Sequence, residues 1–423
     1  MATAILGLFM ASACSGPDVE QAPAPAPAAS KVTAFEGARL ITGDGSAPIE
    51  NAVFVVENDR FVQAGPAGDV QVPAGATRVN LSGKTVMPAI VDTHTHMPTN
   101  RDALIEALQR KAYYGAAVVT SLGQDTGDVA FQVRDEIVPN GALLRTAGRG
   151  ITMPEPGRTE APYWVSNEAE ARKAVQELAA RKVDLVKIWV DDRNGKYKKL
   201  TPALYGAIIE EAHKNGLRVT AHIFTLEDAK GLLRAGLDAF AHSVRDRDID
   251  DEGLAMFKKH ANLVVAPNLP DRGVAADMSW LADSVPAEEL TKLQAAATDR
   301  ADAQKAYGIQ ARNLAKIHAA GVKIVLGTDG GVPWSHHVEM ADMVAAGMTP
   351  SDVIVASTKN SAEFLRLNDA GTIAAGKRAD FLVLDANPLD DITNTRKISA
   401  VYLRGAAIDR AGIKARMSGK ATN

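Results

Sequence analysis

Short apolar runs alternate with longer amphipathic segments through most of this chain. Five of the runs consist mainly of Val, Ile, Leu and Ala and lead through a polar residue into a turn: MPAIVDTHTHMP, VDLVKIWVDD, LRVTAHIF, LDAFAHSV and KIVLGTDGG. Such runs are typical of strands buried on both faces, and helical patterns of roughly 10 to 15 residues between them indicate parallel βα units. The pattern predicts helices at Arg101 to Tyr114, Asn167 to Arg181 and Pro202 to Gly216, and Asn167 with Glu170 is a helix-start signal.

The two ends of the chain have a different pattern. From Val32 to Val86, and again from Gly371 to Ile408, short alternating segments are separated by Gly, Pro, Asn and Asp. Short strands with frequent turns indicate a small β domain rather than βα units. We therefore predict the class α/β, with a (β/α)8 TIM barrel over residues 87–368 and β segments over residues 32–86 and 369–412. Residues 413–423 are predicted to form a C-terminal tail.

Side chains able to bind a metal ion occur where the apolar runs end. They are His94, His96, Lys187, His222, His242 and Asp329. In a closed parallel barrel the carboxyl ends of the strands meet at one mouth, so residues far apart in the sequence come together there. Side chains two apart on a strand point to the same face, so His94 and His96 are both able to bind one ion.

Each of these residues also has an ordinary structural interpretation. A single histidine on an apolar strand is commonly a hydrogen-bonded core residue, Lys187 could extend to solvent or form an ion pair, and Asp329 in GTDGG could be an Asx-turn residue. The shared position of all six at predicted strand ends favours a metal site. Burial among apolar neighbours should lower the pKa of Lys187, and a neutral amine is able to react with carbon dioxide to give a carbamate that bridges two cations.

The chain resembles the amidohydrolase superfamily, in particular the imidazolonepropionase-like branch that also contains prolidase-like and carboxypeptidase-like enzymes with a carboxylated lysine. The resemblance extends from about Val32 to Ile408 and rests on the HTH pair, GLRVTAHIFTLEDAKGLLRAGLDAFAHS, GVKIVLGTDGG and the C-terminal ADFLVLD. It implies that both chain ends join in one β-sandwich beside the barrel. It also implies two divalent ions, the buried one held by His94, His96, Lys187 and Asp329 and the more exposed one by Lys187, His222 and His242.

The predicted metal site indicates a hydrolytic mechanism. Two ions would lower the pKa of a shared water from about 15.7 toward neutrality and so supply a metal-bound hydroxide as nucleophile. The exposed ion would polarise the scissile carbonyl, and Asp329 would pass the proton to the leaving nitrogen as general base and acid. We predict hydrolysis of an amide-type carbon–nitrogen bond in a small N-acyl amino acid, dipeptide or cyclic amide.

Two other functions are compatible with the same residues. An ester or lactone hydrolase is the nearest alternative, because the same attack cleaves either bond. A catalytically silent lipoprotein that only binds a ligand is the alternative from a different class. A deaminase is disfavoured, because deaminases of the family generally use one metal without the modified lysine.

Candidate substrate contacts lie in loops that follow predicted strands. They are Arg149, Tyr197 and His336, of which Arg149 and His336 could equally be loop-packing residues. Imidazole-rich ligation favours zinc, although manganese, cobalt or iron suits the same donors.

Composition agrees with an enzyme of this kind. The 423 residues exceed the about 250 of a bare barrel, which leaves room for an accessory domain. A net charge of −4 and only short basic runs such as KYKK give no indication of nucleic-acid binding. The expected partner is a small-molecule substrate, and a homo-oligomer is compatible with the sequence.

The first 31 residues indicate targeting to the bacterial cell envelope. An apolar segment from Ala2 to Ala13 precedes Cys14, the only cysteine, so residues 1–14 are predicted to be a lipoprotein-type signal with a lipid anchor on Cys14. Residues 15–31 include an Ala/Pro-rich tract and are predicted to be an extended tether. The mature domain would then be soluble and face the periplasm or be anchored to the outer membrane. The alternative is an uncleaved apolar tail with an incidental cysteine.

Overall fold

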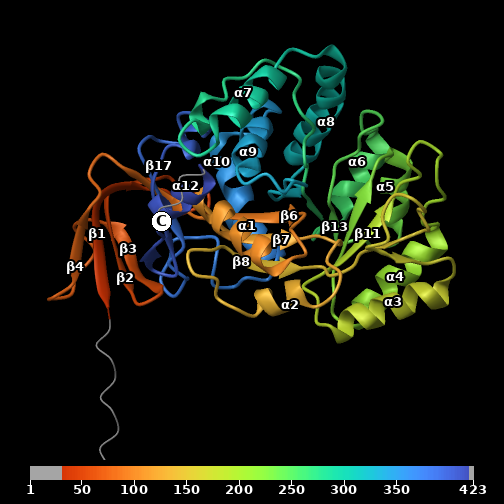
Figure 1. The fold of residues 1–423 in the computed structure, drawn as a ribbon, viewed down its shortest axis with the longest axis horizontal. Coiled ribbons are helices and arrows are strands. Elements are labelled where there is room, and N and C mark those ends of the chain that lie inside the picture. Colours follow the sequence, from red (N-terminus) through yellow and green to blue (C-terminus); the bar gives the residue numbers. More distant parts are fainter. Residues whose placement is uncertain (1–30, 419–423) are drawn as a thin grey trace, which may run out of the picture.

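The computed structural model describes residues 31–418. Figure 1 shows a sheet at one end of the molecule, built from the first and last parts of the described chain, next to a larger unit of parallel strands and helices. The predicted segments 1–14 and 15–31 lie outside the described residues except for Lys31. Within residues 31–418, no helix is both long and apolar enough to cross a membrane.

Eight strands from both ends of the chain form one mixed sheet. Their order is β18-β17-β16-β5-β1-β2-β3, and β4 also pairs with β1. The strands are β1 (Val32–Leu40), β2 (Ile49–Glu57), β3 (Arg60–Pro66), β4 (Thr77–Asn80), β5 (Thr85–Pro88), β16 (Phe381–Leu384), β17 (Ile398–Leu403) and β18 (Ala406–Ala407). The antiparallel pairing of β16 with β5 joins the C-terminal strands to the N-terminal ones.

Aromatic side chains hold this sheet in a curled shape. Phe54 lies on β2 and Phe381 on β16, three strands apart in the hydrogen-bonded order, which in a flat sheet would separate them by about 14 Å. Their ring centroids are only 5.2 Å apart, and Phe35 on β1 stacks on Phe54 with centroids 4.8 Å apart. Both chain ends therefore join in one mixed sheet, which curls around its own aromatic core.

The remaining strands pair in parallel in two sheets. One contains β6 (Ile90–Thr95), β7 (Ala116–Ser121) and β8 (Leu143–Thr146). The other has the order β10-β9-β11-β12-β13-β14-β15, with β9 (Ile151–Thr152), β10 (Tyr163–Trp164), β11 (Val186–Val190), β12 (Val219–Ile223), β13 (Ala239–Phe240), β14 (Val264–Val265) and β15 (Lys323–Ile324). Backbone hydrogen bonds connect the two sheets on both sides: Asp184 N donates to Thr146 O and Thr93 N to Leu326 O, each at 2.9 Å.

Helices follow most of these strands, as the amphipathic pattern predicts. They are α1 (Arg101–Tyr113), α2 (Val129–Arg134), α3 (Glu168–Ala180), α4 (Pro202–Lys214), α5 (Leu226–Arg234), α6 (Asp251–Lys259), α7 (Ala287–Ala296), α8 (Ala301–Ala319), α9 (Ser335–Ala345), α10 (Pro350–Val355) and α11 (Ser361–Phe364). The three helices predicted from the sequence are α1, α3 and α4. Asn167 caps α3, because its side chain accepts a hydrogen bond from Glu170 N at 3.0 Å.

The chain does not continue as a tail from residue 413. Helix α12 (Arg410–Met417) occupies most of that segment, and its Ile413 and Met417 are buried in a small cluster with Tyr113 and Leu281. The helix covers apolar surface beside α1, which explains why it is ordered rather than extended.

Candidate metal centre

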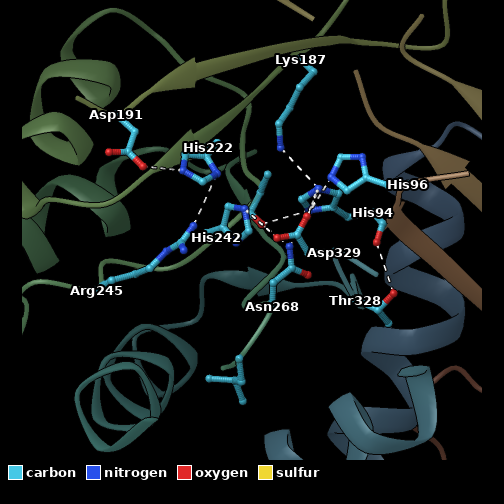
Figure 2. Close-up of polar contacts among 12 residues, drawn as sticks. His94, His96, Lys187, Asp191, His222, His242, Arg245, Asn268, Thr328 and Asp329 are labelled. Atoms are coloured by element: carbon cyan, nitrogen blue, oxygen red, sulfur yellow. Dashed lines mark hydrogen bonds and ion pairs between the residues drawn. The ribbon is translucent and has the colours of Figure 1, made fainter. Parts of the chain in front are cut away.

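The predicted metal ligands come from five different strands or the loops that follow them. His94 lies in β6 and His222 in β12, His242 follows β13 by two residues, and Asp329 lies five residues beyond β15. Figure 2 shows His94, His242 and Asp329 grouped together, with His222 beside them and its ring directed toward Asp191 and Arg245. Lys187 is the second residue of β11, so it does not end its strand as the sequence pattern suggested. Its long side chain nevertheless reaches the centre from there.

His94, His242 and Asp329 form the core of the site. One ligand atom from each lies within 4.8 Å of the others, which suits a single divalent ion. Asp329 Oδ1 is 3.1 Å from His94 Nε2, and Asp329 Oδ2 is 3.6 Å from His242 Nε2. His96 Nε2 lies 2.9 Å from Asp329 Oδ1, so the HTH pair does place both rings on the side of Asp329.

The donor atoms fit a metal ion. His242 Nε2 is buried and has no hydrogen-bond partner within the described chain, which is unusual for a polar atom unless a ligand completes it. Burial, together with the nearby Lys187, lowers the pKa of His94 to about 3, and burial lowers the pKa of His242 well below its usual value. Both rings are therefore neutral at physiological pH and keep a lone pair for coordination.

Asp329 is held as an ionised carboxylate. Burial alone would raise the pKa of its carboxyl, but the neighbouring histidines outweigh burial and keep the pKa far below the usual range. Its backbone lies in the left-handed region with φ 52°, and both Thr328 N and Asp329 N donate to His94 O, at 2.9 and 2.8 Å. These contacts fix the carboxylate over the imidazoles. A positive φ at a residue other than glycine costs energy and is typical of functional sites.

Gly327 allows β6 and the segment after β15 to approach closely. A Cβ added there would lie 2.6 Å from Asn268 Oδ1 and 2.9 Å from His94 Cβ. A larger residue would displace one or both of these side chains from the site.

Lys187 is completely buried beside the histidines. Its Nζ lies 3.5 Å from His94 Nε2 and 5.3 Å from the centre of the Trp189 ring. Burial lowers the pKa of its ammonium to about 7, as the apolar surroundings in the sequence predict. Gly123 and Gly150 leave the room for this packing, because a Cβ at either would collide with Trp189.

His222 is near the cluster, but its ring nitrogens face other residues. The His222 and His242 ring centroids are 4.6 Å apart. His222 Nε2 is 2.9 Å from Asp191 Oδ2 and 3.0 Å from Arg193 Nη1, and its Nδ1 is 3.5 Å from Arg245 Nη2. For His222 to bind a second ion as predicted, at least one of these three side chains has to move away from the ring nitrogen that it contacts.

A family model places this arrangement among known proteins. Residues 85–408 match the model described as the amidohydrolase family, which is most of the chain and includes every residue of the site. The chain belongs to the amidohydrolase family. Together with the donor cluster, this makes it a metal-dependent hydrolase of that family.

Several relatives of this amidohydrolase are known. Ochratoxinase of Aspergillus niger is 26% identical over 88% of this chain and 85% of its own length. Imidazolonepropionase of Deinococcus radiodurans is 26% identical over 85% of this chain and 92% of its own length. The crystal structure of a Xaa-Pro dipeptidase with bound methionine has a similar fold, with a TM-score of 0.71, 22% identity and coverage of 89% of this chain and 99% of that one. The resemblance to the amidohydrolase superfamily and to its imidazolonepropionase-like members is thereby confirmed.

The three predicted substrate contacts of this amidohydrolase are engaged elsewhere. Arg149 donates from Nε to Ala161 O at 2.5 Å and lies over the Tyr163 ring, so it fastens a loop. Tyr197 Oη donates to Pro156 O at 3.1 Å. His336 is completely buried with Nε2 2.8 Å from Tyr114 O, so it has no access to substrate and is left out of the site.

The sequence pattern missed several residues of the site. Asn268, just beyond β14, places its amide nitrogen 2.5 Å from His94 Nδ1 and also hydrogen-bonds Ala241 O. Its place after an apolar run, in VVAPNLP, is the same signal that identified the other site residues. Arg193 and Arg245 also reach the site, but arginines in polar loops carry no comparable signal in the sequence.

Proposed function

We propose that this amidohydrolase cleaves an amide-type carbon–nitrogen bond in a small substrate such as an N-acyl amino acid, a dipeptide or a cyclic amide. The observation that carries the proposal is the cluster of His94, His242 and Asp329, in which the buried His242 Nε2 has no hydrogen-bond partner among residues 31–418. The printed names of the relatives, among them a Xaa-Pro dipeptidase and an imidazolonepropionase, agree with substrates that contain such bonds.

The bound ion, the histidines and Asp329 would have different roles in the reaction. A divalent ion, for which zinc is our choice from the imidazole donors, supplies Lewis acidity that polarises a carbonyl and acidifies water. His94 and His242 would hold the ion as neutral donors, together with His96. Asp329 remains ionised and is partly accessible, with 39% of its side chain exposed, so it is able to accept a proton from the attacking water. It would then deliver that proton to the leaving nitrogen.

We further propose that Lys187 is carboxylated and that a second ion binds with the help of His222. The pKa of about 7 leaves much of the Lys187 amine neutral near pH 7, and amine plus carbon dioxide gives a carbamate and a proton. Zinc content measured by mass spectrometry should fall from two ions to one or none in Lys187→Ala. A short-chain carboxylic acid should restore activity to that variant. Wild-type turnover by Lys187→Ala would rule out this role.

The two parallel sheets support a more specific description of the fold. We propose that β6, β7, β8, β11, β12, β13, β14 and β15 form one closed (β/α)8 barrel. The hydrogen bonds from Asp184 to Thr146 and from Thr93 to Leu326 join the sheets on both sides, as closure requires. The metal ligands would then lie at its C-terminal mouth.

The decisive experiment for the reaction is a substrate screen with the zinc-loaded protein. N-acyl amino acids, dipeptides, cyclic amides and lactones would be compared with wild type, Asp329→Asn and the exposed control Glu288→Gln. We expect amide hydrolysis by wild type and control, and a loss of about 1000-fold or more in Asp329→Asn. Cleavage of lactones without any amide would favour the esterase alternative, and unchanged amide turnover in Asp329→Asn would refute the mechanism.

We also propose export to the cell envelope through Cys14, which lies outside the described residues. Mass spectrometry of the mature protein tests this, since a lipidated N-terminal Cys14 is expected and an intact Met1 would exclude it.

A further inference from the structure

Two arginines from different loops reach the ring of His222. Arg193 follows β11 and Arg245 follows β13, so both start near the strand ends that carry the metal ligands. Arg193 Nη1 is 3.0 Å from His222 Nε2, and Arg245 Nη2 is 3.5 Å from His222 Nδ1. Figure 2 shows Arg245 extending toward His222 from a side different from that of Asp191. The guanidinium groups therefore approach opposite ring nitrogens.

Arg245 is a largely buried cation without an anionic partner. Within the described part of the chain, its guanidinium has no direct ion pair with a carboxylate, and its Nε is buried without a hydrogen-bond partner. Burial lowers the pKa of the group below its usual value. Asp329 and Asp191 partly offset the effect of burial from a distance. Burying a charge without a direct partner costs free energy, so an anion bound to Arg245 is expected to stabilise the folded protein.

Arg193 offers a second donor on the same side of the site. Asp191 and Glu155 partner its Nη1 and Nε, at 2.7 and 3.2 Å, but its Nη2 is buried and has no partner among residues 31–418. Its backbone has φ 55°, and Asn194 follows with φ 60°. These left-handed residues turn the chain sharply, and such strain is tolerated mainly where function requires a side chain in a fixed place.

We propose that Arg245, assisted by Nη2 of Arg193, binds a carboxylate of the substrate beside His222. This inference rests on the proposed amide hydrolysis and narrows its substrates to N-acyl amino acids and dipeptides with a free α-carboxylate. A guanidinium is suited to this because its planar N–H groups pair with the two oxygens of a carboxylate.

The position of Arg245 agrees with the dimensions of such substrates. In an acylated amino acid, the amide nitrogen and the carboxylate carbon are separated by only two bonds, about 2.5 Å. The anion site must therefore lie very near the metal centre. Arg245 contacts His222, whose ring lies 4.6 Å from that of His242 in the donor cluster, and so meets this requirement.

Binding and turnover would be measured separately with matched probes. Calorimetry on zinc-loaded protein would compare N-acetyl-L-leucine with its neutral analogue N-acetyl-L-leucinamide, and the same compounds would be used as substrates. The variants are Arg245→Met, Arg245→Lys and Arg193→Gln. The control is Arg247→Met, an arginine on the same loop whose side chain is 63% exposed.

We expect Arg245→Met to weaken binding of the acid by about 30- to 300-fold, and to raise KM more than it lowers kcat, because a charge-assisted pair is lost. Arg245→Lys should lose less affinity for the acid than Arg245→Met. Arg193→Gln should bind the acid about tenfold more weakly than wild type, and Arg247→Met should bind it as wild type does. Binding of the amide should be unchanged by Arg245→Met. Because an unpaired buried charge is removed, Arg245→Met should unfold at the same or a higher urea concentration than wild type.

The outcomes separate this inference from the proposed reaction. One outcome is that binding of the acid depends on Arg245 but no amide bond is hydrolysed. This result would support the anion site and refute the proposed reaction. Equal kcat/KM for acid and amide in wild type would support the reaction and overturn the anion site. An equal loss of acid and amide binding in Arg245→Met would also overturn it, since that pattern indicates general damage.

Discussion

At the scale of single residues, the surroundings of a side chain decide its chemistry more than its type does. His94, His242, His336 and His337 are all buried and all have a lowered pKa. His336 and His337 place Nε2 2.8 and 2.9 Å from Tyr114 O, whereas His242 Nε2 has no hydrogen-bond partner among residues 31–418 and lies 3.6 Å from Asp329 Oδ2. The sequence could not separate these cases, because a hydrogen bond to a distant carbonyl depends on the folded chain.

Asp342 provides a prediction at this scale. It lies on α9 beside Arg272, 2.9 Å away, and burial raises the pKa of its carboxyl from 3.8 to about 7 despite that cation. The folded protein therefore keeps the proton to higher pH than the unfolded chain, so the stability that this group contributes is complete below pH 3.8 and is lost as the pH rises through about 7. Asp342→Asn should make the fall in unfolding free energy between pH 4 and 7 shallower, by at most about 1.4 kcal/mol per pH unit.

Urea unfolding at several pH values measures this slope. The exposed variant Asp283→Asn is the control and should follow the wild type. If the unfolding free energies of Asp342→Asn and wild type change with pH in parallel, the proposed titration of Asp342 is wrong.

At the scale of elements, a buried ion pair connects β6 to α1 and to the loop that carries Asp329. Lys111 Nζ on α1 lies 3.5 Å from Asp92 Oδ2 on β6 and also donates to Ser335 Oγ at 3.1 Å. Thr328 Oγ1 donates to Asp92 at 2.8 Å, next to Asp329. The helical periodicity of α1 was visible in the sequence, but a lysine on its buried face was not, since charged residues normally lie on the solvent face.

Removing one member of this buried pair should lower the unfolding free energy. Lys111→Met leaves the Asp92 carboxylate buried without a cation, so we expect a loss of about 3 to 5 kcal/mol in unfolding free energy. The double variant Lys111→Met with Asp92→Asn should recover much of that loss, as measured by urea unfolding. A double variant no more stable than Lys111→Met would show that the pair is not what holds these elements together.

At the scale of the whole molecule, the two ends of the chain depend on each other. β16 pairs with β5, and the ring of Phe381 contacts those of Phe35 and Phe54 from the other end of the chain. The strand-like pattern at both ends predicted two β segments correctly. That they form one curled sheet depends on pairings between residues about 300 positions apart, which local periodicity does not specify.

Truncating the shared core tests this dependence. Phe381→Ala should lower the unfolding free energy by about 3 to 5 kcal/mol, because a large buried ring leaves a cavity between strands from both chain ends. Val62→Ala on the exposed face of β3 is the matched control and should change stability by less than about 0.5 kcal/mol. Calorimetric melting measures both, and similar melting of the two variants would argue against a shared core.

The sequence alone determined the α/β class, three helices, the cap of one of them and the residues at the centre of the site. It did so because strand burial, helical periodicity and capping are local and repeat along the chain. The folded structure decided which histidine nitrogens lack a hydrogen-bond partner, that Lys187 lies within its strand rather than at its end, and that His336 is a buried residue. It also decided the position of Arg245 beside His222. These features depend on contacts between distant segments, whose geometry is fixed only when the strands pack side by side.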